Sequence, residues 1–285
     1  MCVKRSAAAW ILGMALCLSG CGNGEKVDTN EEFPADDTTK IVMDIRSWDI
    51  EVSASDDDKI HVGYEGKSKN GRVQIIQKDG MLMIQQDDGP KKNVIERFSF
   101  GKAGKITLHV PQNAKIPWEI NNGSGDVGLE AAAISALSLN NDSGYIVLSG
   151  LAVENAKMDS HTGDIKITDS SFTDSDIHVR SAYVTIKNTD IDKTDILTGS
   201  GEVNMDNINA YDRLSIETDS GDISLSHKSM PDDLSYDISS GSEDITVQFQ
   251  DAGYTADTDG CKQGCIGNGK NSLSIISDSG TITVK

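Results

Sequence analysis

Aliphatic residues return at a spacing of 19 residues over much of the chain, with polar residues between them. The column five residues before a recurrent Ser-Gly turn contains Ile120, Leu139, Met158, Ile177, Ile196, Ile216, Ile238 and Ile275. Two and four residues after each turn, aliphatic residues such as Val127 and Leu129 alternate with polar ones. Such alternation is typical of a strand with one buried face. Each repeat is therefore predicted to hold two or three short strands.

The turn itself forms a second column. Its central position is occupied by Gly125, Gly144, Gly163, Ala182, Gly201, Gly221, Glu243 and Gly280. Glycine permits a positive φ, and the neighbouring Ser and Asp side chains can bond their own backbone. Short strands repeated in register predict an all-β, parallel β-solenoid with coils of about 19 residues and right-handed winding. Equivalent residues should stack about 4.8 Å apart, and one coil cannot stand without its neighbours.

The chain divides into four parts on this pattern. We predict a signal peptide over residues 1–20, an acidic flexible tether over 21–39, irregular strand-rich rungs that cap the first coil over 40–118, and regular repeats over 119–285. A Cys-containing insertion near 250–270 interrupts the last repeats.

The first residues have the features of a bacterial lipoprotein signal. Lys4 and Arg5 precede the apolar segment 7–18, which is too short to span a bilayer. The segment ends Leu18-Ser19-Gly20-Cys21, which resembles a lipobox. Cys21 is therefore predicted to carry a diacylglycerol, and the protein to be extracytoplasmic and anchored in the bacterial cell membrane by lipid.

Two cysteines remain in the mature chain, Cys261 and Cys265. Outside the cytoplasm a local disulfide between them is the default expectation. A redox motif or half of a metal site are alternatives, although two thiols alone do not complete a zinc site.

The layout as a whole resembles a known bacterial family. The lipobox, the irregular strands, the segment Ile106-Thr107-Leu108-His109-Val110-Pro111 and the Ser-Gly-Asp-Val/Ile repeats are similar to the β-strand-repeat family labelled "putative adhesin", a domain of unknown function. The resemblance covers about 40–285. It implies a β-solenoid and an envelope setting, sometimes linked to envelope stress, and it supplies no catalytic residues.

Two sets of surface residues are candidates for chemistry. The position after the turn glycine holds Asp126, Tyr145, Asp164, Tyr183, Glu202 and Asp222. A solvated acidic edge is favoured there over a calcium-binding column, and no metal ligand or cofactor is predicted.

The second set places Asp142, His161 and Arg180 in one column and Asp159 and His178 in another. A Ser-His-Asp hydrolase is conceivable, but serines fill the turns of nearly every coil. Surface charge pairs are therefore favoured, and no catalytic residue is predicted.

Two further expectations concern aromatic residues and the chain end. Trp48, Trp118 and Tyr64 could serve as sugar platforms, but in a chain with few aromatic residues they are expected in the core or cap. The last strand, 281–284, lacks a following cap, so it is expected to be an open edge for a partner strand or end-to-end self-association. The alternative is that the Cys-containing insertion covers that end.

The net charge of the chain excludes one class of function. With 45 acidic and 26 basic residues and a net charge of -19, the chain does not suit nucleic acid. We expect a non-enzymatic, lipid-anchored envelope protein that presents a rigid solenoid for binding or scaffolding, with an envelope protein or polysaccharide as partner. The alternative is an extracytoplasmic carbohydrate-active enzyme on the same scaffold, and a third is a stress sensor partnered with membrane proteins.

Overall fold

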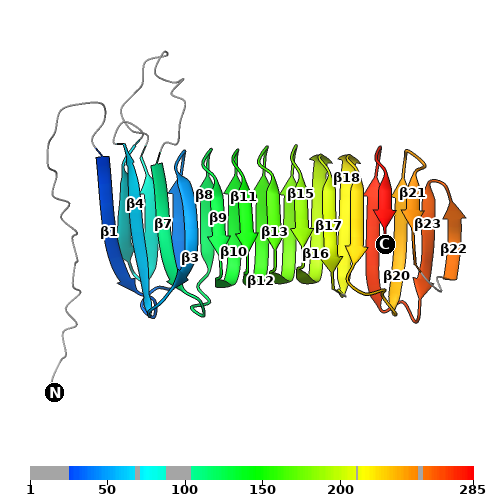
Figure 1. Ribbon diagram of the computed structural model, residues 1–285, viewed down its shortest axis with the longest axis horizontal. Coiled ribbons are helices and arrows are strands. Elements are labelled where there is room, and N and C mark those ends of the chain that lie inside the picture. Colours follow the sequence, from blue (N-terminus) through cyan, green and yellow to red (C-terminus); the bar gives the residue numbers. More distant parts are fainter. Residues whose placement is uncertain (1–25, 68–70, 88–103, 210, 250–252) are drawn as a thin grey trace, which may run out of the picture.

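The protein is described by a computed structural model over residues 26–67, 71–87, 104–209, 211–249 and 253–285. Two sheets face each other and form a long, rod-like solenoid (Figure 1). In order, the 12-stranded sheet A contains β1 (Lys26–Pro34), β4 (Lys59–Lys67), β7 (Gly104–Pro111), β3 (Asp49–Ser55), β9 (Val127–Glu130), β11 (Ile146–Ser149), β13 (Ile165–Thr168), β15 (Val184–Lys187), β17 (Val203–Ile208), β19 (Ile223–His227), β25 (Ile282–Val284) and β21 (Ile245–Val247).

The 13-stranded sheet B lies against sheet A. In order it contains β22 (Gly253–Thr258), β23 (Cys261–Ile266), β20 (Leu234–Ser240), β24 (Asn271–Ser277), β18 (Arg213–Ser220), β16 (Asp190–Ser200), β14 (Ser171–Val179), β12 (Ala152–Ser160), β10 (Ala133–Asn141), β8 (Trp118–Asn122), β2 (Lys40–Ile45), β6 (Met81–Gln86) and β5 (Val73–Lys78). The described ranges contain no helix.

The predicted all-β parallel solenoid is confirmed by the register of the central strands. Leu139 pairs with Ile120 on one side and Met158 on the other, and Met158 pairs in turn with Ile177. All four side chains are buried. The column of apolar residues is therefore a continuous core along the rod, to which every coil contributes a layer.

The order of the C-terminal coils differs from the order in the sequence. Strand β24 pairs with β18 on one side and β20 on the other, and β25 lies likewise between β19 and β21. The last coil, β24 and β25, is thus inserted between the two coils that precede it in the sequence. The expectation that strand 281–284 is an open edge is wrong, because both of its edges are hydrogen-bonded to parallel neighbours.

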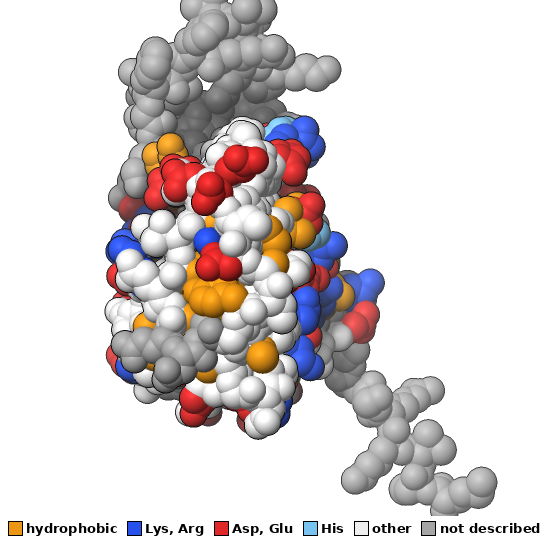
Figure 2. Space-filling view, turned by 90° about the vertical axis from the view of Figure 1, so that its right-hand side faces the viewer, with side chains coloured by type: hydrophobic (Ala, Val, Ile, Leu, Met, Phe, Trp, Pro, Cys, Tyr) orange, Lys and Arg blue, Asp and Glu red, His pale blue; other side chains and the backbone are white. Residues whose placement is uncertain are grey.

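The Cys-containing insertion extends the C-terminal end instead. Strands β22 and β23 form an antiparallel hairpin, and β23 pairs antiparallel with β20. The hairpin therefore covers the free edge of sheet B, while β21 ends sheet A. Figure 2 looks onto this end, where a small group of hydrophobic side chains lies among polar and acidic ones.

Cys261 and Cys265, the pair for which the sequence predicts a disulfide, are free thiols in this hairpin. Both belong to strand β23. Four residues of extended strand separate their Cα atoms by about 13 Å. A disulfide needs Cα atoms less than about 7 Å apart, so the extended backbone keeps the two sulfurs from bonding.

The N-terminal end repeats the same inverted order. The coil formed by β2 and β3 lies next to β8 and β9, and the later strands β6 and β7 lie outside it. Antiparallel strands β4 and β5 then extend the two sheets. Within the stretch predicted as a tether, residues 26–34 form β1 along β4, and Phe33 packs against the core.

Trp48 closes the turn edge of this end. Because Ile50 pairs with Val127, Trp48 occupies the position that glycine holds in the regular coils. Its side chain is fully buried, and its ring lies against the backbone of Gly66 and Gly104. A methyl group at either glycine would collide with the indole, so these two positions must remain small.

A partly buried polar network ties Lys285 to the rod. The Tyr211 hydroxyl lies 3.0 Å from Nε2 of His227, whose Nδ1 lies 2.9 Å from the backbone oxygen of Lys285. Burial lowers the pKa of His227, and the hydrogen bond to Lys285 opposes that effect. The Tyr211 hydroxyl therefore donates to a neutral ring, which donates to Lys285.

Candidate functional site

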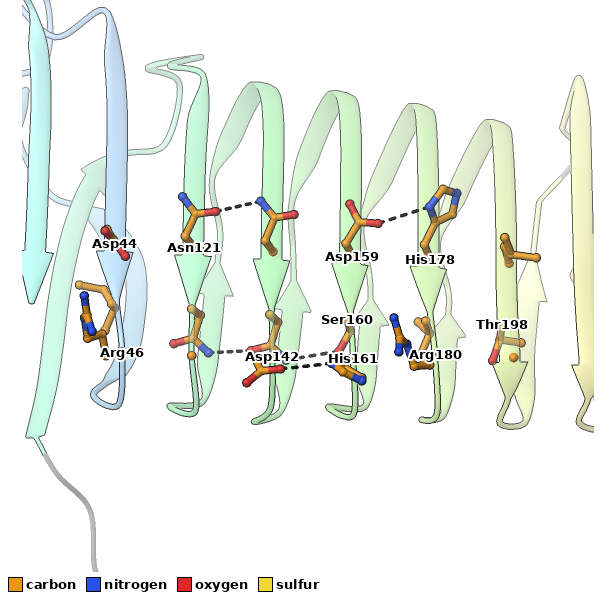
Figure 3. Close-up of a pocket in the computed structure, with 18 of the residues that line it drawn as sticks. Asp44, Arg46, Asn121, Asp142, Asp159, Ser160, His161, His178, Arg180 and Thr198 are labelled. Atoms are coloured by element: carbon orange, nitrogen blue, oxygen red, sulfur yellow. Dashed lines mark hydrogen bonds and ion pairs between the residues drawn. The ribbon is translucent and has the colours of Figure 1, made fainter. Parts of the chain in front are cut away.

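A groove with a volume of about 920 Å³ runs over the outer face of sheet B (Figure 3). Two in-register columns line it. The strand column comprises Asp44, Asn121, Asn140, Asp159, His178 and Leu197. The turn column, two residues later in each coil, comprises Arg46, Gly123, Asp142, His161, Arg180, Gly199 and Asp219.

Alternation within each strand produces these columns. Ile120, Leu139 and Met158 point into the core, so the residue that follows each of them points outward. Parallel in-register pairing then sets equivalent residues about 4.8 Å apart along the rod. The groove is consequently a periodic surface. Gly123 and Gly199 in the turn column leave space in it because they have no side chain.

The sequence-predicted Asp and His residues meet here as two pairs. Nδ1 of His161 lies 3.3 Å from Oδ1 of Asp142, and Nδ1 of His178 lies 3.3 Å from Oδ1 of Asp159. The side chains are 40–75 % exposed. They are therefore surface pairs of the expected kind, worth about 0–1 kcal/mol each.

Ser160, the residue that precedes His161, has a structural role. The Ser160 hydroxyl is buried, donates to the Gly163 carbonyl at 2.7 Å and accepts from the Asn141 side chain at 3.3 Å. It lies on the inner face of β12, whereas His161 is exposed. Ser160 and His161 therefore do not form the nucleophile and base of a hydrolase.

Ser160 continues an inward polar ladder that our sequence analysis missed. The Asn122 amide donates to Asn141 at 2.7 Å and to the Gly125 carbonyl, and Asn141 donates to Gly144. The ladder supports the turn below the groove. Its signal was an amide or hydroxyl residue three before the turn position in every repeat except the one with Val179.

The acidic column on sheet A is part of the backbone architecture. Oδ1 of Asp126 accepts the N–H of Tyr145, and Oδ1 of Asp164 accepts the N–H of Tyr183. Asp222 accepts the N–H of Thr281 in the same way. Each of these carboxylates joins one coil to the next. Within the described ranges no three His, Cys, Asp or Glu side chains gather in a way that could hold a metal ion.

Three aromatic residues weighed as sugar platforms are instead structural. Trp48 and Trp118 are at most 2 % exposed, and Tyr64 packs against the core. The ring centroids of Trp48 and Tyr64 lie 5.9 Å apart. Their expected place in the core or cap is confirmed.

The fold and the groove together define a class, namely parallel β-solenoids that present stacked polar columns. The chain belongs to the Toastrack DUF4097 family, whose sequence profile matches residues 38–285. This confirms the predicted kind of family, a domain of unknown function. A comparison with curated proteins finds no match.

Solved structures from other bacteria have a similar architecture. One is described as a "putative adhesin" from Parabacteroides distasonis, with 13% identity, a TM-score of 0.57, and coverage of 92% of this chain and 98% of that one. Another "putative adhesin", from Bacteroides fragilis, has 14% identity, a TM-score of 0.49 and the same coverage. At this identity the Parabacteroides distasonis structure supports the fold alone.

The predicted lipidation site, Cys21, lies outside the described residues. In the part of the chain that the structure describes, no helix is long and apolar enough to cross a membrane.

Proposed function

We propose that the protein is a non-enzymatic, lipid-anchored protein of the bacterial envelope that presents its solenoid as a rigid binding surface. Cys21 would carry the lipid, and the groove on sheet B would contact a protein partner in the envelope. The names of the similar structures, "putative adhesin" among them, agree with a binding role.

The groove is the observation that carries this proposal. It combines two cationic groups, Arg46 and Arg180, with Asp–His pairs on a chain that is otherwise strongly acidic. Mixed charges at fixed spacing suit a polar protein surface, because complementary charges set register and orientation. The backbone beneath the groove is fixed by the parallel ladders, so binding costs little ordering of the protein.

A photo-crosslinking experiment tests this function. A photoreactive amino acid is placed at Asn140, in the groove, or at Lys166, on the outer face of sheet A. In cells carrying the full-length protein, we expect a discrete crosslinked envelope protein from position 140 only. Combining the Asn140 probe with Arg180→Glu should reduce that product at least tenfold, because the reversed charge repels the partner.

Cys21→Ser is the control for the anchor. This variant should lose incorporation of a palmitate analogue and leave the membrane fraction, while the purified solenoid keeps the same circular dichroism spectrum. Equal crosslinking from positions 140 and 166, or palmitate incorporation that persists without Cys21, would contradict the proposal.

A carbohydrate-active enzyme remains the second candidate, since Asp142 and Asp159 both lie in the groove. Glycan cleavage that is abolished by Asp142→Asn or Asp159→Asn would favour it. The solvent exposure of both carboxylates argues against it, because a general acid is usually tuned by burial.

A further inference from the structure

Two tyrosines stand out on the opposite sheet. Tyr145 and Tyr183 are 60% and 56% exposed, more than any other large hydrophobic side chain in the described ranges. Each follows a turn and precedes a buried strand residue of sheet A, Ile146 or Val184. Exposed aromatic rings are the kind of side chain that binding surfaces favour, because they offer a large contact area with few rotatable bonds.

The register of sheet A fixes the spacing between the two rings. Ile146 pairs with Ile165, which pairs in turn with Val184. Strands β11, β13 and β15 are consecutive in the sheet (Figure 1), so Tyr145 and Tyr183 are two strand spacings apart. That separation is about 9.6 Å along the rod. Asp164 occupies the position between them.

Both tyrosines are held by hydrogen bonds through their backbone. The N–H of Tyr145 donates to Asp126 at 3.0 Å, and the N–H of Tyr183 donates to Asp164 at 2.9 Å. Their carbonyl groups accept the N–H groups of Val127 and Ile165 at 2.8 and 2.9 Å. The backbone under each ring is therefore fixed before any ligand arrives, which lowers the entropy cost of binding.

The surroundings indicate what the rings would bind. Val147, 41% exposed, extends the apolar surface beside Tyr145, and the carboxylates of Asp126 and Asp164 flank the rings. Pyranose rings present C–H faces that stack on aromatic rings, and their hydroxyl and amide groups donate to carboxylates. In an extended β-1,4-linked chain, alternate sugars present the same face, at a distance comparable to two strand spacings. The carboxylates and the net charge of -19 disfavour an anionic polymer.

We propose that Tyr145 and Tyr183 form a two-ring platform that stacks an extended, uncharged β-1,4-linked glycan along sheet A. The platform goes beyond the proposed function, because it lies on the other sheet and does not depend on the groove. Asp164, between the rings, accepts hydroxyl or amide donors of the intervening sugar.

Calorimetric titration with the N-acetylglucosamine hexamer tests the platform. We expect saturable binding by the wild-type solenoid and about tenfold weaker binding for Tyr145→Ala or Tyr183→Ala, because each removes one stacking contact. Tyr145→Phe should bind like wild type. Tyr254→Ala, which removes another exposed tyrosine on β22, is the matched control and should leave the affinity unchanged.

A relocated ring tests the spacing itself. In the double variant Tyr183→Asp with Glu202→Tyr, the rings are three strand spacings apart, about 14.4 Å. The number of tyrosines and acids is preserved, yet this variant should bind as weakly as Tyr183→Ala. Circular dichroism confirms folding of each variant.

Several results would overturn the platform. They are the absence of hexamer binding at millimolar concentration, wild-type affinity in the alanine variants, or wild-type affinity in the relocated variant. Loss of hexamer binding in Arg180→Glu with the tyrosine variants unaffected would place the glycan in the groove and also refute the platform. The crosslinking result at Asn140 is read independently, so failure of one proposal does not decide the other.

Discussion

Met158→Asp is expected to lower the free energy of unfolding by at least about 4 kcal/mol. Losing a methionine side chain from a packed core costs about 2–5 kcal/mol, and burying a carboxylate adds several more. Met158 is fully buried between Leu139 and Ile177 in the middle of the rod. Because each coil is stabilised by its neighbours, we expect most of the chain to lose structure, as measured by urea unfolding followed by circular dichroism.

Lys157→Asp is the matched control for this substitution. Lys157 is the adjacent residue on β12 and points to solvent. The same aspartate there should change the unfolding free energy by no more than about 1 kcal/mol, most of it from repulsion by Asp176, its register partner on β14. Equal effects of the two substitutions would mean that the alternation of inward and outward residues has been misassigned.

Trp48→Ala is expected to cost about 3–5 kcal/mol, in the range for removing a buried tryptophan. The indole fills the turn position where regular coils have glycine, and it lies against Gly66, Gly104 and the ring of Tyr64. Its loss should open a cavity at the N-terminal end, so hydrogen exchange in β4 and β7 should rise more than in β13.

Trp48→Phe tests how much of the stability comes from filling the space that the indole occupies. Phenylalanine refills part of the space and removes the indole N–H, which is buried without a hydrogen-bond partner among the described residues. We expect an intermediate loss of stability. A Trp48→Ala variant within about 1 kcal/mol of wild type would show that the end of the rod is closed by other contacts.

The regular part of the fold was predictable because periodicity encodes it directly. A spacing of 19 residues, two-residue alternation and the Ser-Gly turn together specify parallel coils in register, and the pairing of Leu139 with Met158 follows. The Asp–His contacts in the groove were predictable for the same reason, since a column position determines the neighbour.

The order of the terminal coils was not encoded in that pattern. Ile216, Ile238 and Ile275 are the same residue in the same column, so stacking Ile216 on either of the others satisfies the core equally well. The observed order leaves one edge of β20 for the β22–β23 hairpin, whereas stacking in chain order would occupy both edges of β20 with β18 and β24. Likewise, the β1 pairing of the expected tether is set by the free edge of β4, which no local feature of residues 26–34 reveals.

The hollow shape of the groove was also not predictable from the sequence. It depends on Gly123 and Gly199, together with Arg46 from the N-terminal coil. That coil lies next to β8 and β9 only because β6 and β7 are placed outside it. Long-range strand order of this kind leaves no trace in a periodic pattern.

Engineered disulfides test the in-register stacking and the inserted last coil most directly. In a background of Cys261→Ser and Cys265→Ser, cysteines replace Glu217 and Ile276, which are register partners on β18 and β24. Their Cα atoms should lie about 4.8 Å apart, within the range that a disulfide spans. A second pair replaces Glu217 and Ser239, which would be neighbours if coils stacked in chain order, but which β24 separates. We expect efficient oxidation of the 217–276 pair and none of the 217–239 pair in the folded monomer, and the reverse result would refute this strand order.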